Sequence, residues 1–150
     1  RKSRGGEVKA ESSEHSVGTI IPVELHQSER GSLITIQARK DIPFAICRAY
    51  TIFAVPADAI RGCHAHRKER QFLVCLHGSC SILLDDGCYQ QEYLLDSPRE
   101  GLLIGTNVWR VLSGFSGDCV LNILSDSPYD PEDYIFDYDE FKKSATAGGE

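Results

Sequence analysis

The sequence predicts an all-β domain, either a β-sandwich or a jelly-roll barrel, that ends in one short C-terminal helix. Three observations support this prediction. A length of 150 residues suits one domain, 41% hydrophobic residues suffice for a core, and short β-branched or aromatic runs alternate with turn residues. A mainly disordered chain and a collagen-like chain are both excluded.

The strands are expected to begin at Thr19. The stretch before them, 1–18, is rich in Ser, Gly and charge, so we expect a flexible tail or linker there and a domain over 19–150. About nine apolar runs bounded by turn residues follow as expected strands. They are 19–25, 32–37, 46–55, 71–76, 80–84, 88–95, 101–104, 108–112 and 119–124.

Turn and helix signals complete the prediction. Asp86-Gly87 lies between two runs and is typical of a tight type I′ hairpin turn, and His77-Gly78 is a weaker signal of the same kind. The segment 130–143 is acidic early and basic late, and apolar residues recur in it at helical spacing. We therefore expect a terminal helix over 130–143 with a solvated acidic face.

The charge of the chain is uneven. The formal net charge is −6 at pH 7, which argues against nonspecific binding to nucleic acid. The segment 30–110 holds 10 Lys and Arg against 8 Asp and Glu, so its local charge is +2 and the remainder is strongly acidic. This basic centre is compatible with a site for an anionic small molecule.

The sequence has no membrane signal. Its apolar runs are shorter than the about 18 residues that a spanning helix needs, and 1–16 lacks the apolar stretch of a signal peptide. We therefore expect a cytoplasmic protein with no membrane partner. The 6 cysteines occur singly, without a CxxC pair, so we expect them to be reduced and to act as small buried hydrophobic residues.

The most informative stretch is 61–78, in which His64 and His66 stand two residues apart. Side chains two apart on a strand share a face, so both imidazoles project into whatever that face encloses. Such a pair is either part of a metal site or an acid/base pair, because imidazole exchanges protons near neutral pH. The alternative is two surface histidines on an edge strand.

The spacing of this stretch resembles the first cupin motif, in which His-x-His is followed by a Glu ligand and then by Gly. Here Gln71 stands at the Glu position, while Glu69 falls two residues too early to replace it. In 105–110, which resembles the second cupin motif, Arg110 stands at the position of the last His ligand. A guanidinium repels a divalent cation, so we expect a pocket without metal or other cofactor.

Further polar residues suit an anionic ligand. Arg48 and Tyr50 share a face of an apolar strand, and an arginine turned inward needs a partner. With Arg30, Arg61 and Arg110, Arg48 would suit a diphosphate, although any single arginine could instead pair with a surface carboxylate. The Tyr50 hydroxyl either donates to a developing oxyanion or satisfies a buried hydrogen bond. Trp109, the only tryptophan, either stacks on a base or sugar or anchors the core.

Taken together, these segments resemble the nucleotide-sugar 3,4-ketoisomerases of the cupin superfamily, often called WxcM-like. The resemblance runs in order over roughly 27–143. The matching stretches are ERGSL at 29–33, IPF at 42–44, RAY at 48–50, RGCHAH at 61–66, LDDG at 84–87, LDSP at 95–98, VWR at 108–110, FS at 115–116 and YDPEDYIFDYDEF at 129–141.

The resemblance implies a cupin jelly roll that forms a homodimer, often with an exchanged N-terminal strand, and acts on dTDP-4-keto-6-deoxyglucose. The product would be the 3-keto isomer, which an aminotransferase converts to a 3-amino-3,6-dideoxy sugar for surface glycans such as lipopolysaccharide. One departure is Thr51, where a second Tyr is common. The residues implied are His64 and His66 for catalysis and Arg30, Arg48, Tyr50, Arg61, Gln71, Trp109 and Arg110 for substrate binding.

The residues fit this chemistry, because moving a ketone from C4 to C3 requires only that protons move between carbon and oxygen. We expect His64 to move the carbon proton and His66 the oxygen protons. A dTDP-sugar 3,5-epimerase-like cupin, a metal-dependent cupin oxygenase and a non-catalytic sugar-binding cupin are the alternatives.

Overall fold

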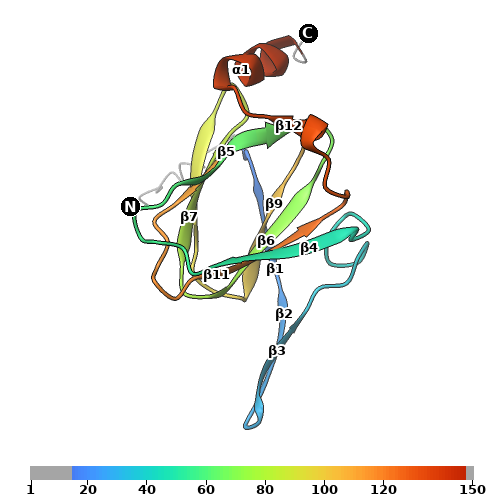
Figure 1. The fold of residues 1–150 in the computed structure, drawn as a ribbon. Helices are drawn as coiled ribbons and strands as arrows, with labels where there is room; N and C mark the ends of the chain where they lie inside the picture. Colours follow the sequence, from blue (N-terminus) through green and yellow to red (C-terminus); the bar gives the residue numbers. More distant parts are fainter. Residues whose placement is uncertain (1–14, 148–150) are drawn as a thin grey trace, which may run out of the picture.

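Two five-stranded antiparallel sheets face each other in the computed structural model, which describes residues 15–147 (Figure 1). The first sheet has the order β1 (Thr19–Pro22), β9 (Glu100–Ile104), β6 (Gln71–His77), β11 (Val120–Ser125) and β4 (Arg48–Phe53). The second has the order β12 (Tyr134–Ile135), β5 (Arg61–His66), β10 (Trp109–Ser113), β7 (Cys80–Asp85) and β8 (Gln90–Leu95). The predicted jelly-roll fold is confirmed.

The core lies between the two sheets. Alternate residues of the strands point inward, so that Ile82 and Leu84 of β7 pack with Leu73 of β6 and Leu121 and Ile123 of β11. Each of these five side chains is at most 1% exposed. Burial of such apolar surface is the main force that holds the sheets together.

One expected strand, 19–25, is two strands in the structure. β1 pairs with β9, and after the buried Val23 the chain leaves that sheet and forms a hairpin from β2 (Glu24–Ser28) and β3 (Gly31–Thr35). The hairpin extends away from the two sheets (Figure 1). Its residues are largely exposed, with Leu33 55% exposed.

The predicted helix over 130–143 is wrong in its first half. A 3-10 turn covers Pro131–Asp133, strand β12 pairs Tyr134 with His66 of β5, and helix α1 covers only Tyr138–Ala147. The Asp133 carboxylate accepts hydrogen bonds from the backbone N–H groups of Lys68 and Glu69, which holds this segment against the end of β5. The Asp137 carboxylate accepts from the N–H of Glu140, so the helix begins after Asp137.

The expected tail, 1–18, lies largely outside the described residues. Its last four residues, 15–18, contact the domain, which places ordered chain before the expected start at Thr19. The backbone of Gly18 exchanges hydrogen bonds with the Tyr93 hydroxyl, and a Cβ at Gly18 would lie only 2.6 Å from Leu84. The chain can follow this path because glycine has no side chain.

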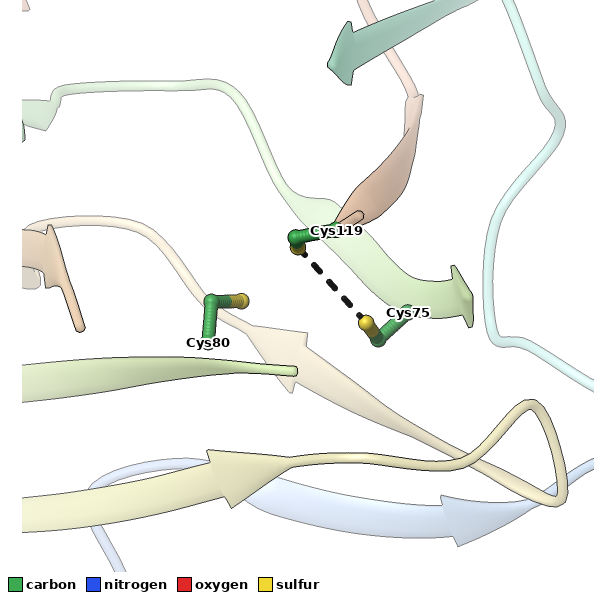
Figure 2. Close-up of side chains that lie close together, drawn as sticks. All are labelled: Cys75, Cys80 and Cys119. Carbon is green, nitrogen blue, oxygen red and sulfur yellow. Dashed lines mark hydrogen bonds between the residues drawn. The ribbon is translucent and has the colours of Figure 1, made fainter. Parts of the chain in front are cut away.

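The expectation that all cysteines are buried holds for three of the six. Cys47, Cys63 and Cys88 are exposed, whereas Cys75, Cys80 and Cys119 are buried, and all six are free thiols. The three buried sulfurs lie within 4.8 Å of one another, and those of Cys75 and Cys119 are 3.8 Å apart (Figure 2).

The buried cysteines belong to the hydrophobic core, where they pack among aliphatic side chains. The Cys75 thiol lies within hydrogen-bonding distance of the backbone carbonyls of His77 and Gly78, and burial raises the pKa of Cys119 to about 11. Among the described His, Cys, Asp and Glu residues, none adds a fourth ligand to the set, whereas structural zinc takes four. We therefore interpret the three as packing residues of the core.

Within residues 15–147, no helix is long and apolar enough to span a bilayer.

Candidate active site

A cavity of about 300 Å³ lies between the two sheets. One wall comes from β4, β6 and β11, and the other comes from β5, β10 and β12. Its polar lining residues are Arg48, Tyr50, Arg61, His64, Gln71, Arg110 and Tyr134, so the structure brings together six of the residues predicted for the site.

A bulge in β5 positions His64. Arg110 pairs with His64 and Val111 pairs with Gly62, so Cys63 is the extra residue, and its φ of 55° is in the left-handed region. The Nδ1 atom of His64 lies 3.0 Å from the carbonyl oxygen of Gly62. A carbonyl can only accept, so the proton is on Nδ1 and Nε2 is the basic atom of the ring.

His66 lies behind His64 and is only 1% exposed. Their Nε2 atoms are 3.2 Å apart, and their rings meet edge to face. The Nδ1 atom of His66 lies 3.1 Å from the carboxylate of Asp133, which already accepts two backbone N–H groups. His66 therefore also carries its proton on Nδ1 and directs Nε2 toward its neighbour.

Both imidazoles are neutral at pH 7. Burial, and after it the charge of Arg110, lowers the pKa of His64 from 6.5 to about 4. The same two effects lower the pKa of His66, and the nearby Asp133 opposes them. At neutral pH, His64 is consequently a free base at the wall of the cavity.

Gln71 and Arg110 stand at the two positions that hold metal ligands in metal-binding cupins, and their side chains bind each other. Arg110 donates from Nη1 to Oε1 of Gln71 at 2.6 Å and from Nη2 to the carbonyl of Val108 at 3.0 Å. Burial lowers the pKa of Arg110 to about 10, so the side chain remains charged at neutral pH. A buried cation and an amide do not fit a divalent metal site.

Glu69 compensates the buried positive charge. It is 2% exposed and accepts hydrogen bonds from Arg48 at 2.7 Å, from Nε2 of Gln71 at 2.6 Å and from Ser125 at 2.6 Å. Sequence reasoning excluded Glu69 as a ligand and missed this role. The signal that could have found it is the cost of burying Arg48 and Arg110 without a carboxylate.

Two guanidinium groups of the cavity wall have unused donors. Within the described residues, the buried Nε atoms of Arg48 and Arg110 have no hydrogen-bond partner. The Tyr50 hydroxyl accepts from Nε2 of Gln71 at 3.1 Å and retains its own proton to donate. These two Nε atoms are buried, so the Tyr50 hydroxyl is the donor of this set that a ligand oxygen in the cavity can reach directly.

Aromatic side chains near the cavity were also missed by sequence reasoning. The Tyr134 ring lies 4.9 Å from that of His64 and stacks on Phe136 at 5.2 Å, and Phe136 is 67% exposed. No pattern in the sequence marks Tyr134, because its position follows from the pairing of β12 with β5.

Two predicted binding residues lie outside the cavity. Trp109 is 9% exposed and packs against Tyr138 and Phe141 of α1, because alternation along β10 turns it outward when Arg110 faces inward. Trp109 therefore does not line this cavity and occupies the place of a core anchor, the alternative that the sequence allowed. Arg30 is exposed in the turn between β2 and β3 and does not line the cavity.

Comparisons with known proteins agree on one family. Residues 16–146 match the family described as FdtA: WxcM-like, C-terminal. The chain is 52% identical over 114 residues to the TDP-4-oxo-6-deoxy-alpha-D-glucose-3,4-oxoisomerase of Aneurinibacillus thermoaerophilus, covering 76% of this chain and 82% of that protein.

Solved structures agree with this result. QdtA, a sugar 3,4-ketoisomerase from Thermoanaerobacterium thermosaccharolyticum solved in complex with TDP, is 36% identical with a TM-score of 0.87, covering 90% of this chain and 98% of that one. A 3,4-ketoisomerase from Helicobacter canadensis is 39% identical with a TM-score of 0.85, covering 88% and 99%. NovW, a 4-keto-6-deoxy sugar epimerase from Streptomyces spheroides, is 18% identical and shares the fold alone.

Proposed function

We propose, because this chain belongs to the FdtA family (WxcM-like, C-terminal), that it is a nucleotide-sugar 3,4-ketoisomerase. It moves the ketone of dTDP-4-keto-6-deoxyglucose from C4 to C3. The single observation that carries the proposal is the pair of Nε2 atoms 3.2 Å apart, one of them a free base at the wall of a cavity lined by arginines. Its relative from Aneurinibacillus thermoaerophilus bears the name of this reaction.

The reaction needs a base that removes a proton from C3 and returns one to C4. Nε2 of His64 takes the C3 proton, and the electrons of that C–H bond form the C3–C4 double bond of an enediolate while the ketone oxygen at C4 gains negative charge. The hydroxyl proton of O3 is then moved to O4, and a proton is added to C4. His66 does not line the cavity, so we propose that it serves this exchange through His64: it holds the carbon proton while Nε2 of His64 moves the proton from O3 to O4. Protons and electrons balance, so these steps need no redox cofactor.

The donors of the cavity wall suit the oxygens of this substrate. A hydrogen bond to Gln71 fixes the Arg110 side chain in the cavity wall, and its positive charge stabilises the enediolate. Tyr50 donates to a sugar oxygen, Arg48 adds a second cation, and Arg61, which is exposed at the rim, binds the diphosphate. Each predicted binding residue that lines the cavity thus has a proposed role, whereas Trp109 lies outside the cavity and has none.

Arg30 reaches the site in a homodimer. The hairpin of β2 and β3 extends away from the two sheets (Figure 1). Its Leu33 is 55% exposed, so the described residues of one chain leave this side chain largely uncovered. We propose that the hairpin is exchanged between two copies and that Arg30 binds the phosphates at the partner's cavity. The active unit would then be a dimer of the domain over 19–150.

The biological setting that we propose is the one that the family resemblance implies. A 3-keto sugar is a substrate for an aminotransferase, and a 3-amino-3,6-dideoxy sugar is a component of surface glycans such as lipopolysaccharide. The six free thiols are compatible with work in the reducing cytoplasm.

Nuclear magnetic resonance of the protein with dTDP-4-keto-6-deoxyglucose in deuterated water tests the function. We expect the ketone to move to C3, with solvent deuterium at C3 or C4. Deuterium at C5 would indicate the 3,5-epimerase-like alternative instead. Binding without any exchange would indicate a sugar-binding cupin and would refute the isomerase proposal.

A further inference from the structure

The proposed reaction leaves the buried carboxylate of Glu69 without a role in proton movement. Three of its contacts, with Arg48, Gln71 and Ser125, explain how a charge is tolerated at 2% exposure. A fourth contact is different, because Oε2 of Glu69 lies 3.2 Å from Nε2 of His66. That nitrogen is the one that faces His64.

His66 is therefore placed between two carboxylates. Asp133 lies 3.1 Å from Nδ1, and Glu69 lies 3.2 Å from Nε2. Nδ1 of His66 carries the proton that it donates to Asp133. In the neutral ring Nε2 therefore has a lone pair and no proton, and it cannot form a hydrogen bond with the Glu69 oxygen, which also accepts. The contact becomes a charge-assisted hydrogen bond only when Nε2 is also protonated.

The partner that can supply this second proton is His64. Nε2 of His64 is its basic atom and lies 3.2 Å from Nε2 of His66. After His64 has taken a proton from carbon, an N–H bond breaks on His64 and another forms on His66, and no electrons are gained or lost by the pair. The reverse transfer returns the proton when C4 is protonated.

We propose that Glu69 is a positioning residue that acts through His66, stabilising the imidazolium cation that forms while His66 holds the proton received from His64. This inference rests on the proposed isomerase function. The positive charge of Arg110 disfavours a second cation nearby, and the two carboxylates offset that repulsion at the ring that receives the proton. Glu69 does not line the cavity, so its effect on substrate is indirect.

The test compares Glu69→Gln with the wild-type enzyme on dTDP-4-keto-6-deoxyglucose. Glutamine keeps the shape and removes the charge, so we expect kcat to fall by about 10- to 100-fold while KM changes less than about threefold. Loss of a nearby negative charge lowers the pKa of an imidazole, so the acidic limb of kcat/KM against pH should move to lower pH. Glu69→Asp keeps the charge and should recover part of kcat.

The matched control is Glu92→Gln on β8, the same change at an exposed carboxylate outside the cavity. It should leave kcat and the pH profile unchanged. Circular dichroism reports whether Glu69→Gln folds. If it does not, Glu69→Asp carries the test, because its shorter side chain moves the carboxylate away from His66 and should lower kcat relative to wild type while KM is retained. A retained kcat, or a rise in KM alone, overturns the proposal, because Glu69 would then act only on binding through Arg48 or Gln71.

Histidine titration followed by NMR without substrate separates this inference from the proposed function. The midpoint of His66 should move to lower pH in Glu69→Gln and stay in place in Glu92→Gln. If wild-type protein shows this contact but no isomerisation, the proposed function fails and the contact stands. If the midpoint does not move, the contact proposed for Glu69 is refuted whatever the activity.

Discussion

His64 and His66 present their Nε2 atoms to each other at 3.2 Å while each Nδ1 binds a fixed acceptor, the Gly62 carbonyl for His64 and the Asp133 carboxylate for His66. The tautomer of both rings is thereby set by the fold. Only His64 lines the cavity, so the ring that meets substrate and the ring that stores a proton are different residues.

The first prediction concerns these two rings. His64→Asn and His66→Asn should each lower turnover by about 10³-fold or more, because asparagine keeps hydrogen-bonding ability without a titrating base. Turnover is measured by NMR of the sugar, and circular dichroism checks that the fold is intact. Activity close to wild type in either variant would rule out the mechanism with two histidines.

The second prediction concerns pH. Because burial and Arg110 lower the pKa of His64 to about 4, the base stays unprotonated well below pH 6.5. The acidic limb of kcat/KM should therefore have its midpoint nearer 4 than 6.5. A limb centred at pH 6.5 would show that the ring is not desolvated.

The same shift affects stability in a defined direction. Between pH 6.5 and about 4 the unfolded chain binds a proton at His64 that the folded chain does not, so the free energy of unfolding should fall as pH drops through this window. Urea unfolding at pH 7.5 and pH 5 measures the change. His64→Asn should show a smaller change than wild type between these two pH values.

The sequence predicted the parts of the site that depend on strand alternation. His64 with His66, and Arg48 with Tyr50, lie together because residues two apart share a face, and the same rule turns Trp109 away when Arg110 points inward. The contributions of Asp133 and Tyr134 depend on how 130–137 folds back onto β5, which a local helical pattern does not reveal. Glu69 was missed because its role depends on three-dimensional charge pairing.

The third prediction concerns the lost metal positions. Gln71→Glu combined with Arg110→His restores a carboxylate and a third imidazole beside His64 and His66, so the double variant should retain about one equivalent of a divalent transition metal after dialysis. Gln71→Glu alone keeps the buried guanidinium, which would pair with the new carboxylate, and should retain none. Elemental analysis measures both, and stoichiometric metal in active wild-type enzyme would contradict the expected metal-free pocket.

The fourth prediction concerns the proposed exchange of the hairpin. Arg30→Ala should raise KM by about tenfold or more through loss of a phosphate contact, and His64→Asn should be inactive. Co-expressed with different tags, the two variants form mixed dimers in which one site has both His64 and the partner's Arg30. At substrate concentrations well below KM the mixture should recover up to about a quarter of wild-type activity, because half of the dimers are mixed and each holds one intact site. No recovery would place Arg30 outside the partner's site, and sedimentation analysis provides the oligomeric state independently.

The last prediction concerns the bulge that aims His64. Cys63 is exposed and has a φ of 55°, a conformation that costs a residue with a side chain about 1 kcal/mol relative to glycine. The adjacent Gly62 has a φ of 79°, and a Cβ added to it would lie 3.0 Å from the carbonyl oxygen of Arg110. Cys63→Gly should therefore keep activity and leave the free energy of unfolding equal or raised by up to about 1 kcal/mol. Gly62→Ala should lower both stability and kcat, because the strained carbonyl of residue 62 holds Nδ1 of His64. Urea unfolding and sugar NMR on both variants measure these effects, and a Gly62→Ala protein with normal kcat would show that the bulge does not control the orientation of the base.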